Sequence, residues 1–525
     1  MPRLKPKPSP LICQAVRVCE ASPQSGLSGY PNFPLKHFAL LAMSVLAMSG
    51  CASLGSDAAK SLPPQAVLRD AESLGLASSK AGPVLSEPQW WRTLADEQLD
   101  RLIEQALRDN PTLKVVQARI VRAQAGVEST QAAAGPQLGL AVDLSSQRYT
   151  ANGAVPPPLA GAVRDSGSAL ISGSWELDFF GKNRAALDAA LGQSRAVQAD
   201  ALAARMLLAY QVARTYFQTG RLNAQIELTE KQLALRAHML ALVQTRFEAG
   251  LDTRVELLQA QSSMPELRQQ LVALQEQLAL ASHALDALLG QPKSTWVLKP
   301  PALPESIKAL AVAEVPADLL GRRADIAAAR WRVEAAIGDV ATARNQFYPN
   351  VNLLAFVGMS SIGLDRLLSA GSEQWGGGPA LRLPLFDGGR LRAQLRGRSA
   401  ELDLAIESYN ATVIDAIHDV ADQLSSAQAT GRQQSEQLSA QALAQDSLRL
   451  AEQRQAGGLT NRVAVINAEL GLLSQRRQAL ELSARALDTH LALIRALGGG
   501  YLADLPTSPA TPRPIAGRAS PVLLN

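Results

Sequence analysis

Side chains that could carry out chemistry are few in this sequence, and they form no recognisable catalytic motif. Paired carboxylates occur only among Arg and Gln residues in helical stretches, and no Ser/His/Asp or Cys/His arrangement is present. The histidines include no pair at the spacing of metal ligands: His37, His238, His283, His418 and His490. The sequence therefore predicts no catalytic site, no cofactor and no bound metal, and we expect that the protein is not an enzyme.

Cys51 is a residue for which the sequence does indicate chemistry. Residues 38–50, FALLAMSVLAMSG, are too short to span a bilayer permanently and suit the core of a signal peptide. They end in Met48-Ser49-Gly50-Cys51, which resembles a lipoprotein signal box, although Leu is commoner than Met at the first position. We expect residues 1–50 to be removed and the Cys51 thiol to carry diacylglycerol. The alternative is a plain signal peptide followed by an incidental Cys.

Charge and cysteine content fit this interpretation. The net charge of +4 and the pI near 9.0 come from the first 50 residues, so the remainder is close to neutral and nucleic-acid binding loses its support. The charged residues of that leader are Arg3, Lys5, Lys7, Arg17, Lys36 and the single acid Glu20. The other two cysteines, Cys13 and Cys19, also lie there, so no disulfide is expected in the mature chain.

Two short segments, EAGLDT (248–253) and AGGLTN (456–461), interrupt long helical patterns. Each has a Gly followed by Leu, and Gly is the preferred residue where a helix stops in a left-handed conformation. We therefore expect a tight helix reversal at each segment. An apolar side chain exposed at such a turn is unfavourable unless it binds a partner, so Leu251 and Leu459 also indicate a docking surface.

The two turns and the segments that flank them belong to a unit that occurs twice in the sequence. RFEAGLDTRVELLQAQ (246–261) aligns with RQAGGLTNRVAVINAE (454–469), and Pro136 aligns with Pro349. The sequence predicts an N-terminal segment and two repeats, with a Pro-rich linker between them and a Pro-rich tail: 51–95, 96–290, 291–315, 316–500 and 501–525. Each repeat is expected to run helix, strand, loop, strand, very long helix, turn and return helix.

Alternating apolar and polar residues predict four strands, at about 137–148, 168–180, 350–360 and 378–386. Loops rich in Gly and Pro, 150–167 and 361–375, join them in pairs. Four amphipathic strands are too few to close a membrane barrel, since the smallest have about eight. Several chains must then share one barrel, unless the strands form a soluble sheet covered by helices.

The long helices are expected at about 182–248 and 388–456, and the return helices at about 252–289 and 460–497. Neither long segment contains Pro, and each reaches roughly 100 Å at about 1.5 Å per residue. Ile226, Leu233, Leu240 and Phe247 recur every seven residues, the spacing of a coiled coil. Such helices need partners along their whole length.

These segments together resemble a known family, the TolC-like and NodT-like outer-membrane factors of tripartite efflux systems. The resemblance covers nearly all of 51–501, and the segments that carry it are WWRTLADEQLDRLIEQALRDNPTL (90–113), WELDFFGKNR (175–184), GRRADIAAARWRVEAAIGDVATARNQFYPN (321–350), PLFDGGRLRA (384–393) and LGGGY (497–501). It implies a mainly α fold with a membrane β part. In the implied homotrimer, a 12-stranded barrel continues into a long α-helical barrel in the periplasm.

The resemblance also suggests roles for particular residues. It places the contact with a periplasmic adaptor protein at the two turns, on Gly250, Leu251, Gly458 and Leu459. It places a periplasmic gate just after the second turn, on Val463 and Asn467, with Val255 and Gln259 as first-repeat equivalents. Relatives are expected to have a carboxylate where this chain has Asn467, so the constriction here would be a neutral amide ring with weaker cation selectivity.

Other motifs have ordinary structural interpretations. We expect Trp90 and Trp91 to pack the N-terminal segment against the helices, and Arg322 or Arg323 to form a salt bridge with Asp325. The Asp387-Gly388-Gly389 segment is expected to turn a strand into a helix, because its glycine spacing fits no nucleotide loop.

The favoured function is passive export through the outer membrane of a Gram-negative bacterium, with a lipid anchor, an adaptor and an inner-membrane pump as partners. The substrates would be drugs or other small toxic compounds. A type I protein-secretion duct would have the same architecture. A structural envelope lipoprotein is a third alternative, but it would need no barrel strands.

Overall fold

The computed structural model describes residues 89–293, 299–301 and 323–499. The expected signal peptide, Cys51, Arg322, most of the linker and the C-terminal tail lie outside the described residues. The described residues cover most of the two repeats and the end of the N-terminal segment.

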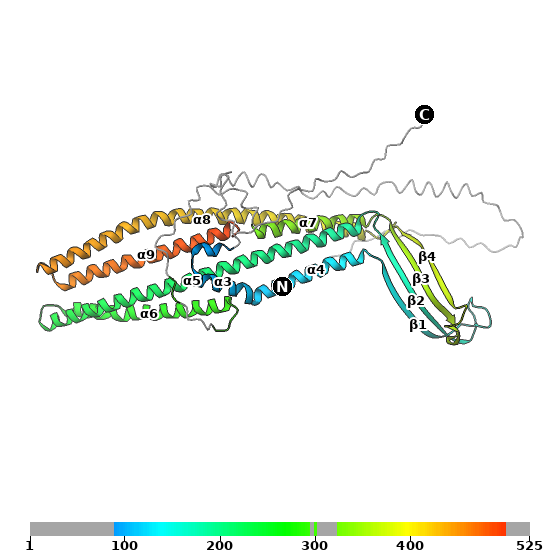
Figure 1. The fold of residues 1–525 in the computed structure, drawn as a ribbon, viewed down its shortest axis with the longest axis horizontal. Coiled ribbons are helices and arrows are strands. Elements are labelled where there is room, and N and C mark those ends of the chain that lie inside the picture. Colours follow the sequence, from blue (N-terminus) through cyan, green and yellow to red (C-terminus); the bar gives the residue numbers. More distant parts are fainter. Residues whose placement is uncertain (1–88, 294–298, 302–322, 500–525) are drawn as a thin grey trace, which may run out of the picture. The chain divides into compact units, whose positions relative to one another are not determined.

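Both halves have the predicted order of helix, strand, strand, long helix and return helix (Figure 1). The elements of the first half are η2 (Trp90–Leu94), α3 (Glu97–Asp109), α4 (Pro111–Ala133), β1 (Gln137–Arg148), β2 (Val163–Leu177), α5 (Lys182–Glu248) and α6 (Arg254–Leu288). Those of the second half are α7 (Ala324–Asn345), β3 (Asn350–Ile362), η4 (Leu364–Arg366), β4 (Glu373–Arg382), α8 (Arg390–Ala456) and α9 (Arg462–Ala496). The duplicated fold is confirmed.

The first helix of the first half is broken between α3 and α4 at Asn110 and Pro111. The Asn110 Oδ1 accepts a hydrogen bond from the Thr112 amide at 2.8 Å, and Pro111 occupies the first turn of α4. Pro suits this position because the amide that it lacks would have no partner in the helix. The Asn110 side chain also donates to the Leu288 carbonyl at 2.8 Å, which ties the break to the end of α6.

The strands form one antiparallel sheet in the order β1-β2-β3-β4. Its register places Leu140, Ile171, Val357 and Trp375 in one row across all four strands. Because side chains alternate between the faces of a strand, residues an odd number of positions away point to the other face, among them Asp143 and its partner Ser168. The sheet therefore has one apolar face and one face rich in Ser and Gly.

Two strands, β2 and β4, differ from the prediction at both ends. β2 begins at Val163 and ends at Leu177, so Phe179 lies in the turn before α5 and not in the strand. β4 begins at Glu373 and ends at Arg382, because its partner strand begins opposite at Asn350 and Pro384 has no amide to donate.

Glycines explain why the start of β4 was missed. They are rare in strands, and the predicted loop runs through Trp375 with the strand beginning only at Gly378. Within the sheet, a Cβ on Gly376 would meet the Phe356 ring at 2.8 Å. The ring of the neighbouring strand thus occupies the space that a side chain would fill.

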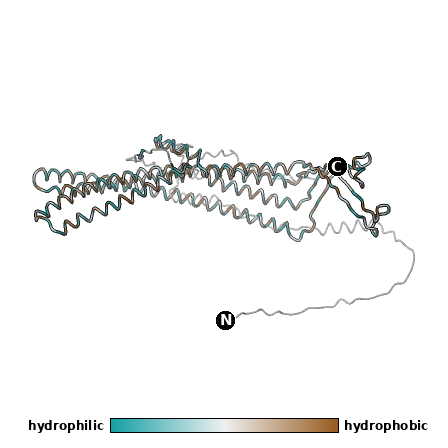
Figure 2. The backbone as a smooth tube through the Cα atoms, turned by 90° about the horizontal axis from the view of Figure 1, so that it is seen from below, coloured by the Kyte–Doolittle hydropathy of each residue, from teal (hydrophilic) through white to brown (hydrophobic). Residues whose placement is uncertain are grey.

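Helices α5 and α8 each have 67 residues. α5 packs against α4, α6, α7 and α9, and α8 packs against α7 and α9. At the crossing of α5 and α7 a Cβ on Gly338 would lie 2.8 Å from the Ala189 backbone nitrogen, so the helices approach as closely as Gly allows. Among the described helices none is long and apolar enough to cross a membrane, and hydrophobic and hydrophilic residues are mixed along them (Figure 2).

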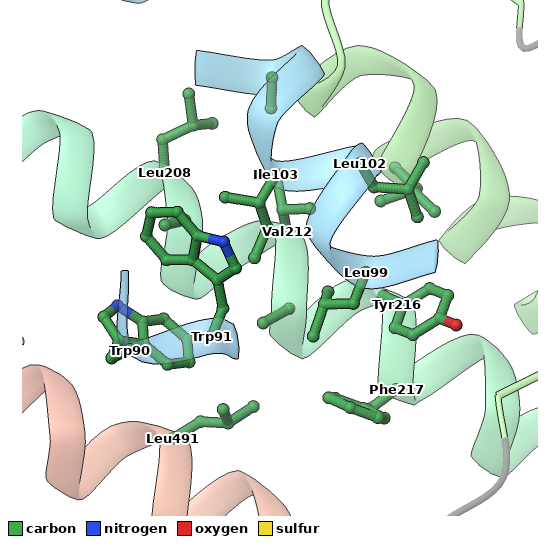
Figure 3. Packing of buried hydrophobic residues seen from close by; sticks show 14 of the residues in the cluster. Trp90, Trp91, Leu99, Leu102, Ile103, Leu208, Val212, Tyr216, Phe217 and Leu491 are labelled. Atoms are coloured by element: carbon green, nitrogen blue, oxygen red, sulfur yellow. The ribbon is translucent and has the colours of Figure 1, made fainter. Parts of the chain in front are cut away.

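The largest apolar cluster surrounds the N-terminal segment (Figure 3). Trp90 and Trp91 are buried, and they pack with α3, with Leu208 and Val212 of α5, and with Leu491 of α9. Burying an aromatic side chain removes about 150–250 Å² of surface from water, which makes such residues a large part of a core's stability. The predicted packing role of the two tryptophans is confirmed, and this cluster holds the two repeats together.

Candidate functional site

The apolar face of the sheet is exposed in the single chain. Leu138, Leu140, Val142 and Leu144 of β1 lie in a line along it, and Leu138 is 80% exposed. A soluble sheet would bury such a face against helices. Only the short η4 contacts the strands appreciably among the described elements, and no described α-helix covers the sheet, so the soluble alternative lacks its covering layer.

The first turn ends α5 with a specific backbone motif. Gly250 has φ of 74°, the Gly250 amide donates to the Phe247 carbonyl, and the Leu251 amide donates to the Arg246 carbonyl at 2.8 Å. These are the two hydrogen bonds of a Schellman motif, which requires a left-handed residue at this place. Leu251 is 69% exposed. The chain then enters α6 through Thr253, which forms a reciprocal capping box with Glu256.

A salt bridge closes the first turn. The Arg246 guanidinium donates from both Nε and Nη2 to the Asp252 carboxylate at 2.8 to 3.0 Å. These hydrogen bonds hold the pKa of the Asp252 carboxyl below its ordinary value. Asp252 is the less exposed partner, with a side chain only 10% accessible. The last turn of α5 is thus bound to the residue that precedes α6.

The second turn has the same backbone and different side chains. Gly458 has φ of 72°, and the Leu459 amide donates to the Arg454 carbonyl at 2.8 Å. Arg454 corresponds to Arg246, but Thr460 stands where Asp252 does, so no equivalent salt bridge can form. Asn461 caps α9 by accepting from the Ala464 amide, without a reciprocal acid. Leu459 is also exposed, at 73%.

The proposed gate residues differ in how far they are buried. Val463 is half-buried in a cluster with Met239 and Val243 of α5 and Ile466 of α9. Asn467 lies one turn further along α9 and is exposed, as are Val255 and Gln259 at the start of α6. Within one chain the structure therefore brings Val463, but not Val255, against the long helix α5.

The start of the second repeat is held by a charged network. Arg323 bonds Asp325 at 2.8 Å and donates to the Ala496 carbonyl at 3.0 Å, and Arg495 bonds Asp419 at 3.0 Å. Burial alone would raise the pKa of the Asp325 carboxyl, but Arg323 outweighs it and the pKa lies below its ordinary value. The network joins α7, α8 and α9, and the predicted salt bridge at Arg323 is confirmed as structural.

The turn after β4 also has the predicted form. Gly388 and Gly389 both have positive φ, and the Asp387 carboxylate accepts from the amides of Gly389 and Leu391 at 2.9 and 2.8 Å. The carboxylate therefore caps the first turn of α8. Among the described residues no group of three or more His, Cys, Asp or Glu side chains is arranged to hold a metal ion.

Sequence reasoning missed the Arg246–Asp252 bridge. The two charges are six residues apart, and a continuous helix would place them on different sides. The signal was the contrast between LDTR (251–254) and LTNR (459–462), in which one repeat has the acid and the other does not.

Among the described residues, four amphipathic strands with an exposed apolar face are joined to two very long helices, which is the architecture of an outer-membrane channel protein. The chain belongs to the outer membrane efflux protein family, whose sequence model matches residues 102–291 and 315–499. It is an outer-membrane protein.

Individual relatives agree with this membership. The chain is 33% identical to the multidrug resistance outer membrane protein MdtQ of Escherichia coli O157:H7 over 79% of this chain and 88% of the relative. It is 32% identical to MdtP of Escherichia coli K12 over 88% and 95%. The crystal structure of the outer membrane protein VceC from Vibrio cholerae aligns with a TM-score of 0.72 and 36% identity, covering 79% of this chain and all of that one.

Proposed function

We propose that the protein is the outer-membrane exit duct of a tripartite efflux system, in which an inner-membrane pump and a periplasmic adaptor deliver the cargo. The observation that carries this function is the direct continuation of the amphipathic sheet into α5 and α8, within a chain of the outer membrane efflux protein family. The duct is passive and performs no catalysis. MdtQ and MdtP are named for multidrug resistance, which favours drugs and other small toxic compounds as cargo.

The duct is a homotrimer with one 12-stranded barrel. β1 and β4 each have an edge with no partner strand in the described chain, and an open edge in lipid leaves backbone groups without hydrogen bonds. α6 has a stripe of exposed apolar residues at Leu258, Val272 and Leu280, and α8 has Leu443 and Leu450. Neighbouring copies would cover these stripes and pair the free edges. Native mass measurement in detergent tests this, since a stable membrane-inserted monomer would exclude a shared barrel.

The trimer is anchored by lipid on Cys51 and docks its adaptor at the two turns. The signal box before Cys51 supports the anchor, and mass spectrometry of the N-terminus of membrane-extracted protein decides it. An unmodified N-terminus elsewhere would refute it. The exposed Leu251 and Leu459 at rigid Gly turns support the docking surface.

Complementation tests the function as a whole. The full-length gene, expressed with its genomically adjacent pump and adaptor in a strain without outer-membrane efflux channels, should restore resistance to several drugs. A type I secretion duct would instead release a protein substrate into the medium. A structural lipoprotein would restore envelope integrity but neither form of export, and that result would overturn the proposal.

A further inference from the structure

A cavity of about 310 Å³ lies where the sheet meets the long helices. The end of β2, the start of α5, the turn between α7 and β3, the end of β4 and the start of α8 all line it. An apolar cavity of about 150 Å³ holds a molecule of benzene, so this space suffices for a small organic compound. Segments from both repeats form the cavity, and neither repeat could build it alone.

The cavity has two arginines that form no close salt bridge, although the charge of Arg390 helps to lower the pKa of the nearby Asp387 carboxyl. The carboxylate of Glu176 pairs with Lys182, and the Asp178 carboxylate accepts from the Arg184 amide at 2.8 Å. Both acids of the cavity are therefore engaged. Arg382 and Arg390 line the same cavity, and neither forms a salt bridge with any residue that the structure describes.

An aromatic pair forms another part of the cavity. The rings of Phe180 and Tyr348 stack with centroids 5.0 Å apart and planes 8° from parallel. Tyr348 comes from the turn before β3 and Phe180 from the turn before α5, so the stack fixes the two turns together. Asn350 adds a buried Oδ1 with no hydrogen-bond partner in the described chain.

The sheet register shows which side the cavity lies on. Arg382 is opposite Asn350 in the β3–β4 pair, and both lie on the face that contains the Ser-rich rows. The apolar row from Leu140 to Trp375 is on the other face. In a barrel with its apolar face toward lipid, Arg382 faces the lumen, so the cavity opens on the path of the cargo.

We propose that this cavity is a transit site for small aromatic carboxylates, and it therefore deepens the proposed duct function by naming a substrate class. The guanidinium groups of Arg382 and Arg390 bind the carboxylate, because a guanidinium presents paired donors that match its two oxygens. The aromatic ring lies against Phe180 and Tyr348. Neutral or cationic compounds of the same shape lack the charge that the two arginines require.

Fluorine NMR on the full-length lipoprotein in detergent tests the site, with para-fluorobenzoate as the anionic probe and para-fluorobenzylamine as the cationic one. We expect para-fluorobenzoate to bind and the amine not to bind. Arg382→Gln and Arg390→Gln should each weaken benzoate binding about tenfold, the loss expected for one charge-assisted hydrogen bond. Arg392→Gln is the matched control, since Arg392 is an exposed arginine of the same helix outside the cavity.

The outcomes separate the site from the duct. Equal binding of both probes, or equal loss in Arg390→Gln and Arg392→Gln, would overturn the site whether or not the protein exports drugs. Benzoate binding that depends on Arg382 and Arg390, in a protein that fails complementation, would support the site and refute the duct. If Arg382→Gln impairs trimer assembly, Arg390→Gln decides the question alone, because Arg390 lies outside the strands.

Discussion

The two helix turns have nearly the same backbone conformation, but different side-chain interactions stabilise them. In both, a left-handed Gly and a Schellman pair of hydrogen bonds end a helix of 67 residues. Only the first turn adds a bidentate salt bridge and a capping box. The two repeats therefore share the backbone motif that reverses the chain. They differ in the salt bridge and the capping box, which make the reversal rigid. We infer that the first turn is the more rigid of the two and that the second adjusts more readily to a partner.

Of the changes at the two turns, replacing the left-handed glycine should have the largest effect on drug export. We expect Gly458→Val to abolish drug export while the trimer still inserts, because a β-branched residue at φ of 72° costs about 1–3 kcal/mol of local strain and deforms the docking turn. Gly250→Val should act in the same way. Resistance in the complemented strain and crosslinking to the adaptor are the measurements.

The chain offers a control one residue away. Gly457 has φ of −80°, and the first turn has Ala249 at the same place. A Cβ there would meet other atoms no closer than 3.6 Å, so Gly457→Ala should export normally. Adaptor crosslinking that persists in Gly458→Val would count against docking at the turns.

Exchanging the residues that make or lack the salt bridge between the two turns should have an intermediate effect, seen in the hydrogen exchange of the turn amides. Asp252→Thr gives the first turn the residue of the second and removes the bridge to Arg246, whereas Thr460→Asp offers Arg454 a carboxylate. We expect hydrogen exchange of the Leu251 amide to become about tenfold faster in the first variant, and that of Leu459 to become slower in the second. Unchanged exchange at both amides would show that the backbone motif alone sets the rigidity.

The salt bridge also predicts a difference in pH dependence. The pKa of Asp252 is lowered in the folded chain, so its contribution is complete above the unfolded value of about 3.9 and is lost as pH falls through the lowered pKa. Exchange measured between pH 5 and pH 8, corrected for the intrinsic rate, should therefore leave the first turn equally protected. Loss of protection near pH 6 would contradict this assignment.

Long-range repetition made most of the fold predictable. A helix of 67 residues without Pro, with apolar residues every seven, leaves few alternatives, and the repeat doubles the signal. The extension of β4 through Gly376 was not predictable, because it depends on the Phe356 ring of another strand. Local propensity is a weak guide wherever a neighbour decides the conformation.

The functional features also divide into those set by local sequence and those that depend on distant segments. The turns at Gly250 and Gly458 were predictable because the chemistry of a helix stop is local. The Arg246–Asp252 bridge requires the reversal to exist first, and the cavity at Arg382 and Arg390 combines five separate segments. The gate residues stay a prediction, since their role concerns neighbouring copies of the chain.

The smallest expected effect concerns the position that follows each turn. Asn467 and its first-repeat equivalent Gln259 are exposed amides, and an amide ring binds cations more weakly than a carboxylate ring does. We expect Asn467→Asp to raise the cation-to-anion permeability ratio in planar bilayers about twofold and to strengthen block by multivalent cations. Gln259→Glu adds the same charge in the first repeat. If the constriction lies after the second turn, this change should affect the permeability ratio and the block by multivalent cations less than Asn467→Asp does. If the wild type is blocked as strongly as Asn467→Asp, the constriction does not lie at Asn467 or other carboxylates serve it.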